Sequence, residues 1–116
     1  MLLPEIIKNF IKAVNTGDEE LLKSCISQNC HIYDQGEDSH INGLLEITEW
    51  IRNLKKDFEL TSEIKSSEEK LGVHILSVVA IGNFPSSPHQ FYYFFTLTYG
   101  LISNITIILG KPNISL

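Results

Sequence analysis

Residues 15–50 read NTGDEELLKSCISQNCHIYDQGEDSHINGLLEITEW, and they carry most of the architectural signal in this chain. Gly17 ends one helix, and Asp18, with two glutamates after it, is placed as the N-cap of the next. A short strand then ends at Asp34 before a glycine-containing turn, and Gly43 precedes a longer amphipathic helix. The stretch therefore predicts a helical hairpin, a short strand pair and a third helix, in that order.

The sequence on either side completes a two-part architecture. Residues 4–14 place apolar side chains three and four residues apart, which predicts an amphipathic first helix. Helices followed by a meander of strands predict an α+β fold, with the helices on one face of an antiparallel sheet. The strands are expected in four segments rich in β-branched and aromatic residues, which span residues 60–66, 71–82, 90–98 and 101–109. The first turn between them is expected at residues 67–70.

Composition places the chain among single-domain globular proteins. Its 116 residues are 43% hydrophobic and 20% charged, so we expect one domain over residues 1–110 and a flexible tail over 111–116. No apolar run approaches the roughly 18 residues of a membrane span, and the first residues lack a basic leader, so we expect a cytoplasmic protein without a membrane partner. The net charge of -5 argues against nucleic acid, because phosphate binding needs clustered Lys and Arg.

Cysteine and motif content argue against bound cofactors. Cys25 and Cys30 are expected to be buried thiols, and together with His31 they lack the second ligand pair of a zinc site. The sequence contains no P-loop, dinucleotide fingerprint, serine elbow or metalloprotease motif. We therefore expect no metal and no cofactor.

The segment 90–98 predicts a homodimer. Alternate residues of a strand face opposite sides, yet Phe91, Tyr93 and Phe95 on one side and Tyr92 and Phe94 on the other are all aromatic. The helices can cover only one face of the sheet. We expect the other face to be buried against a second copy of the chain, since symmetric homodimers are the commonest soluble oligomers.

Asp34 is the central candidate for chemistry. It ends a strand that reads half-buried and stands just before the turn at Gly36, so two interpretations are open. In the first, its carboxylate faces an apolar cavity together with Ile32, its pKa is raised by desolvation, and it acts as a general base. In the second, it is a surface turn residue that caps local backbone groups.

The possible partners of Asp34 are equally open. Tyr93 or His74 could supply a second donor, and His40 could form an acid–base pair with the carboxylate. His40 could also be a solvated edge residue, and His74 could be a core or interface histidine. Trp50 reads as either core or ligand platform, and His89 is expected at a rim.

Taken together, these features resemble the nuclear transport factor 2-like superfamily and its polyketide cyclase (SnoaL-like) branch, over about residues 5–110. The resemblance implies a curved sheet wrapped as a cone around three helices of the N-terminal half, which is a cystatin-like roll. It also implies a hydrophobic pocket at the mouth of the cone and a dimer through the convex face. It rests on the helix break at residues 15–18, Tyr33-Asp34, Gly43 with Ile47 and Trp50, and the segments 82–85, 95–97 and 100–102.

Ketosteroid isomerase, a member of that superfamily, is similar in one further respect. Asp34 precedes Gly43 by the spacing that separates the isomerase's catalytic aspartate from its glycine, which implies a base role for Asp34. The oxyanion-hole tyrosine of that enzyme falls on Phe10, which has no donor, and its protonated aspartate falls on Tyr93. We therefore do not expect true ketosteroid isomerase activity.

The sequence thus predicts a SnoaL-like small-molecule pocket protein that binds a mostly apolar ligand without a cofactor. It would be an isomerase, cyclase or dehydratase with Asp34 as base. The alternative is a non-catalytic ligand-binding or protein-association module whose pocket is filled by its own side chains. Candidate catalytic residues are Asp34, His40 and Tyr93, and candidate pocket residues are Phe10, Ile32, Trp50, His74, Phe91 and Phe95.

Overall fold

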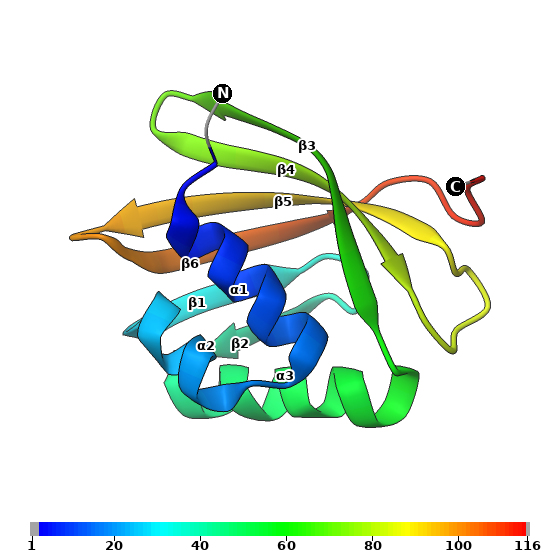
Figure 1. Cartoon of the computed structure of the whole chain (residues 1–116), viewed down its shortest axis with the longest axis horizontal. Helices are drawn as coiled ribbons and strands as arrows, with labels where there is room; N and C mark the ends of the chain where they lie inside the picture. Colours follow the sequence, from blue (N-terminus) through cyan, green and yellow to red (C-terminus); the bar gives the residue numbers. More distant parts are fainter. Residues whose placement is uncertain (1–2, 116) are drawn as a thin grey trace.

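A computed structural model describes residues 3–115 of the chain; residues 1, 2 and 116, which belong to the predicted domain and tail, lie outside this range. Three helices and six strands follow one another in the order shown in Figure 1. They are α1 (Glu5–Thr16), α2 (Glu19–Cys25), β1 (Ile26–Asp34), β2 (Ser39–Asn42), α3 (Gly43–Phe58), β3 (Thr61–Lys70), β4 (Val73–Ile81), β5 (His89–Thr98) and β6 (Leu101–Leu109).

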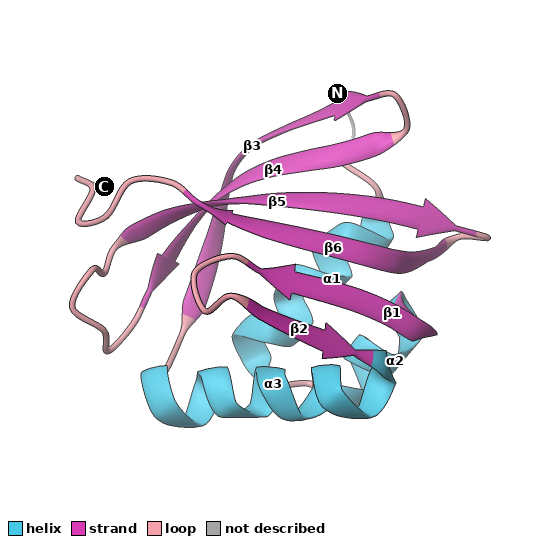
Figure 2. Cartoon of the chain, turned by 180° about the vertical axis from the view of Figure 1, so that it is seen from behind, coloured by secondary structure: helices cyan, strands magenta, loops and turns pink. Residues whose placement is uncertain are grey.

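The strands form one open, curved sheet in the order β2-β1-β6-β5-β4-β3, and the helices lie on one side of it (Figures 1 and 2). The predicted α+β class and helix-covered sheet are confirmed. The sheet is mixed, because β1 and β6 pair in parallel whereas every other neighbouring pair is antiparallel. The reason is that α3 connects β2 to β3 as a crossover, so these two strands run in the same direction. The chain then reverses three times, between β3 and β4, β4 and β5, and β5 and β6. Strand β6 therefore runs opposite to β2 and parallel to β1.

The prediction of a turn at residues 67–70 is wrong. Strand β3 continues to Lys70, and the chain reverses at Leu71 and Gly72, both at positive φ. A two-residue hairpin of this kind needs positive φ at its central residues, and Gly72 adopts that conformation without steric cost. The polar run in β3 is tolerated because β3 is an edge strand, where charged side chains also discourage pairing with other chains.

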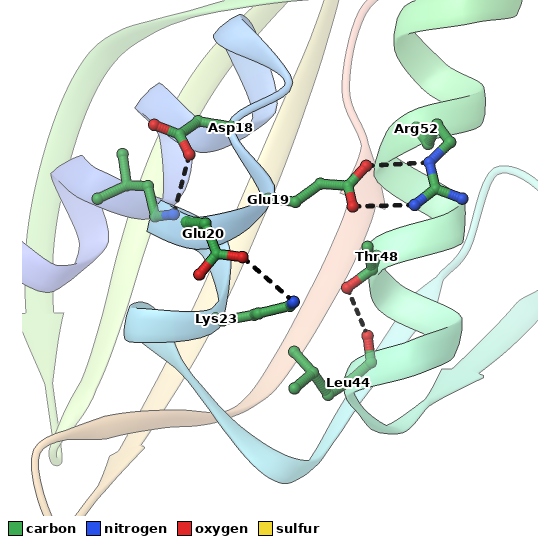
Figure 3. Close-up of polar contacts among 8 residues, drawn as sticks. Asp18, Glu19, Glu20, Lys23, Leu44, Thr48 and Arg52 are labelled. Atoms are coloured by element: carbon green, nitrogen blue, oxygen red, sulfur yellow. Dashed lines mark hydrogen bonds and ion pairs between the residues drawn. The ribbon is translucent and has the colours of Figure 1, made fainter.

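The hairpin of α1 and α2 forms as the sequence predicts. Gly17 ends α1 in the left-handed conformation, with its N–H donating to the carbonyl of Ala13 at 2.8 Å. Asp18 caps α2 by accepting a hydrogen bond from the N–H of Leu21 at 3.0 Å (Figure 3). Arg52 of α3 then donates two hydrogen bonds to the carboxylate of Glu19, at 2.9 and 3.0 Å, which ties α2 to α3 (Figure 3).

The core lies between the helices and the concave face of the sheet. Phe10 of α1 meets Phe95 of β5 edge to face, with 5.7 Å between the ring centroids. Asn15, at the end of α1, makes two hydrogen bonds to the backbone of Ser62 in β3, at 2.8 and 2.7 Å. The largest fully buried side chains include Ile7, Leu22, Ile32, Ile47, Ile51, Leu76, Ile102 and Ile105.

Both cysteines are free and buried, as expected. Burial raises the pKa of Cys30 to about 11, and burial also raises the pKa of Cys25, so both thiols stay protonated near neutral pH. Within residues 3–115, none of the helices combines the length and apolar character needed to cross a bilayer.

Candidate functional site

A cavity of about 730 Å³ opens between α3 and the sheet, at the end where β1, β4 and β6 finish and β5 begins. Its volume lies within the range of pockets that hold small organic molecules. Most of its wall is aliphatic or aromatic, with a few polar groups among them. The helix contributes Trp50, Asn53, Leu54 and Phe58, the loop before β5 contributes Phe84, Pro85 and Ser86, and the sheet contributes mainly Asp34, Ala80, His89, Phe91, Tyr93, Ile107 and Leu109.

Asp34 and Tyr93 belong to one row of residues that crosses the sheet. Asp34 on β1 pairs with Ile107 on β6, and Ile107 pairs with Tyr93 on β5. Two strand spacings therefore separate the Asp34 and Tyr93 backbones, about 10 Å. Both side chains line the same cavity, so a small molecule lying over Ile107 can reach both.

The Asp34 carboxyl group combines the two roles that the sequence left as alternatives. One oxygen, Oδ1, accepts a hydrogen bond from the N–H of Gly36 at 3.1 Å and so caps the turn after β1. Asp34 also lines the cavity, and burial raises the pKa of its carboxyl group above the ordinary value. The hydrogen bond from Gly36 opposes this rise in pKa, and the charge of Glu37 adds to it.

The phenol of Tyr93 is held neutral inside the cavity wall. Its ring is buried and stacks on Phe95, with 5.9 Å between centroids. Burial, with a further contribution from the charge of Asp34, raises the Tyr93 pKa well above its usual range. A hydrogen bond with the Ser62 side chain opposes this rise in the Tyr93 pKa. A neutral phenol can donate a hydrogen bond.

His89 is one of the pocket residues that the sequence does not predict. It was expected at a rim, yet only 8% of its surface is exposed and its ring stacks on Phe91, with 4.7 Å between centroids. Its ring forms part of the cavity wall, and neither ring nitrogen has a hydrogen-bond partner among the described residues. The available signal was alternation, because His89 is in phase with Phe91 and Tyr93 on β5.

The charge of the lining is negative. Asp34 and Glu37 both line the cavity, and no Lys or Arg belongs to its wall within residues 3–115. In the same range, no three His, Cys, Asp or Glu side chains converge as a metal site would require. The lining therefore disfavours an anionic ligand, and a carboxyl group among apolar side chains is compatible with proton-transfer chemistry.

No family model matches the chain, and no curated protein matches it. Solved structures do match. A protein assigned provisionally as a polyketide cyclase from Sinorhizobium meliloti superposes with a TM-score of 0.84 at 25% identity, covering 90% of this chain and 94% of that one.

The chain has the nuclear transport factor 2-like fold. A protein with a ketosteroid isomerase-like fold from Catenulispora acidiphila, crystallised with trimethylamine, matches at a TM-score of 0.82 and 12% identity over 94% of this chain and 88% of that one. A protein from Agrobacterium tumefaciens, assigned provisionally as an isomerase of the SnoaL-like family, matches with a TM-score of 0.77 at 15% identity. The match covers 92% of this chain and 96% of that one. The resemblance to the SnoaL-like, polyketide cyclase branch is confirmed by these matches.

The nuclear transport factor 2-like fold brings some of the predicted site residues together and leaves others apart. Asp34, Tyr93, Trp50 and Phe91 line the cavity. Phe10, Ile32 and Phe95 belong to the buried core and do not line it, and neither does His74, which lies on β4 opposite Phe95.

His40 lies on the other face of the sheet. In the pairing of β1 with β2, Ser39 is opposite Asp34, so alternation turns the next residue, His40, away from the cavity. There its Nδ1 lies 2.8 Å from Nε2 of His31, and its ring packs against Tyr33. The Asp34–His40 pair considered from the sequence is therefore not formed.

Proposed function

We propose that the chain binds a small, neutral, mostly apolar molecule in the cavity and acts on it as an isomerase, cyclase or dehydratase, with Asp34 as the general base. One observation carries this proposal: Asp34 and Tyr93 line the same largely apolar cavity, in one row across the sheet. The similarity to provisional polyketide cyclases and SnoaL-like isomerases supports the same class of chemistry.

The reaction would begin with removal of a proton from a carbon next to a carbonyl group. The C–H bond breaks, its proton forms an O–H bond with Asp34, and its electron pair moves into the enolate. Tyr93 donates a hydrogen bond to the enolate oxygen as negative charge develops there. Return of the proton from Asp34 to another carbon gives isomerisation. Attack of the enolate on a carbonyl carbon, whose oxygen then takes the proton from Asp34, gives cyclisation. Departure of a β-hydroxyl group as water, with the proton from Asp34, gives dehydration.

The raised pKa of Asp34 suits this role. A base works best when its pKa lies near the operating pH, and desolvation by the cavity wall moves Asp34 in that direction. The Gly36 hydrogen bond fixes one oxygen, Oδ1, at the turn. We infer that the other oxygen, Oδ2, is the one that accepts the proton.

The alternative of a module with a self-filled pocket is less well supported, because a cavity of about 730 Å³ remains between α3 and the sheet. A non-catalytic binding protein would keep this cavity but would not exchange protons with its ligand. Deuterium exchange therefore separates the two.

The test uses neutral cyclic ketones in D₂O. First, thermal shift selects those that bind, and we expect neutral planar compounds to raise the melting temperature more than anionic analogues do. NMR then follows deuterium uptake next to the carbonyl group. Asp34→Asn should keep binding and lose exchange, and Tyr93→Phe should slow exchange by roughly 100- to 1,000-fold. Equal exchange in the wild type and Asp34→Asn would refute the base role, and a preference for anionic ligands would refute the ligand class.

A homodimer through the convex face is the second part of the proposal. Tyr92 is 37% exposed on that face and pairs with Ile108, while Phe94 beside it pairs with Ile75. An apolar group of this kind on a single chain is typical of surfaces covered by a partner. Because the face lies opposite the helices, two copies can pair there without blocking the cavity, which lies on the helix side.

A further inference from the structure

Two histidines meet on the face of the sheet that lies away from the cavity. His31 of β1 and His40 of β2 are nine residues apart in the chain. The hairpin brings them onto the same face, because Tyr33, two residues after His31, pairs with His40. Nε2 of His31 and Nδ1 of His40 lie 2.8 Å apart. Neither ring belongs to the wall of the cavity, so the proposed function does not use this pair.

Asn104 of β6 fixes the position of the proton on His31. Its Oδ1 lies 3.1 Å from Nδ1 of His31, and an amide oxygen can only accept a hydrogen bond, so Nδ1 carries the proton. Nε2 of the neutral His31 ring therefore has the lone pair, and it accepts a hydrogen bond from Nδ1–H of His40. Histidines that bind metals usually have this arrangement, in which one ring nitrogen donates to an oxygen atom and the other faces the metal.

The spacing of the two nitrogens favours one coordination geometry over another. Two ligands bound at a right angle, each about 2.0 Å from a metal ion, are about 2.8 Å apart, whereas two ligands of a tetrahedral ion are about 3.3 Å apart. The separation of 2.8 Å therefore suits the square-planar or tetragonal coordination of Cu²⁺ and Ni²⁺ better than the tetrahedral coordination of Zn²⁺. The ion would lie to one side of the line between the nitrogens, and the exposed side chain of His40 can turn its lone pair toward it.

We propose that His31 and His40 together bind one Cu²⁺ or Ni²⁺ ion on the outer face of the β1–β2 hairpin, with Asn104 orienting His31. The ion replaces the hydrogen bond between the rings, and His40 then carries its proton on Nε2, so both rings stay neutral. Within residues 3–115 no third His, Cys, Asp or Glu converges on the pair, so water fills the remaining coordination positions. The net charge of -5 favours a cation. This site is independent of the proposed function.

The test is an isothermal titration of the chain, without an affinity tag, with nickel chloride as the probe. We expect one ion per chain. His31→Gln and His40→Gln each leave a single imidazole, and each should weaken binding by about 100-fold, because two linked ligands bind far more tightly than one. Asn104→Ala should weaken binding by about 10- to 100-fold, which is the usual effect of removing the group that orients a metal-binding histidine.

His74→Gln is the matched control, because it removes a histidine from β4, and β6 and β5 lie between that strand and β1. It should bind Ni²⁺ as the wild type does, and circular dichroism should show the same fold for every variant. Electron paramagnetic resonance of the wild type with one equivalent of Cu²⁺ should show two bound imidazole nitrogens, and this count needs no variant. Absence of Ni²⁺ binding by the wild type, unchanged binding in His31→Gln and His40→Gln, or a single bound imidazole in the Cu²⁺ spectrum would each refute the site.

Discussion

Replacing Asp34 by Asn and by Ala separates the two roles of this side chain. The Asn variant would keep an oxygen that can accept the Gly36 hydrogen bond, now 3.1 Å long, while removing the charge. The Ala variant would remove both. The difference between the Asn and Ala variants then reports the cap, and the difference between the wild type and the Asn variant reports the buried charge.

The expected free energies follow from the site. Loss of a turn-capping bond costs about 0.5–2 kcal/mol, and we expect the lower half of this range because Gly36 is exposed and water can replace the bond. The Ala variant should therefore be less stable than the Asn variant at every pH. The Asn variant should be at least as stable as the wild type at pH 7, because desolvation penalises the ionised carboxyl group.

The pH dependence has a definite sign. Burial raises the pKa of Asp34 in the folded state, so the folded state binds the proton more tightly than the unfolded state does. The stability from this group is fully present below the unfolded pKa of about 3.9 and is lost as the pH rises through the folded pKa. The advantage of the Asn variant over the wild type should therefore be larger at pH 7 than at pH 4.

Urea denaturation followed by the fluorescence of Trp50, the single tryptophan, measures all three proteins at both pH values. Two results would refute the reasoning. A wild type more stable than the Asn variant at pH 7 would show that the charge is favourable where it lies. A gap between them that does not change with pH would show that the Asp34 pKa is the same in both states.

Three further changes test other parts of the structure. Asn15→Ala removes both hydrogen bonds to the Ser62 backbone and should lower the free energy of unfolding by about 2–3 kcal/mol in urea; a loss below about 0.5 kcal/mol would contradict the importance of this link. Tyr92→Asp should convert a sedimenting dimer into a monomer, and a wild type that is already monomeric at micromolar concentration would end the dimer proposal. Gly82→Ala places a Cβ 2.5 Å from the carbonyl oxygen of Phe58. The substitution should lower the free energy of unfolding by about 1–3 kcal/mol and weaken ligand binding by shifting the loop before β5. An unchanged free energy of unfolding would contradict the close approach.

The candidate site was only partly predictable. Asp34 and Tyr93 could be named because each follows from a local pattern, a strand end before a turn and an alternating aromatic strand. The pairing of Asp34 with His40 failed because the register of β1 with β2 places Ser39, and not His40, on the cavity side. Alternation along β5 places His89 on the same face as Phe91 and Tyr93, but its enclosure also depends on segments distant in the sequence, such as α3, which line the same cavity.

What the sequence by itself determined is the set of elements and their class. Helix periods, the cap at Asp18, the glycine at position 17 and the β-branched strands act over a few residues, so they can be read without knowledge of the rest of the chain. Only the tertiary structure decided the parallel pairing of β1 with β6, the face on which His40 lies and the enclosure of His89. These depend on strand register and on contacts between distant segments, where a shift of one residue turns every side chain to the opposite face of the sheet.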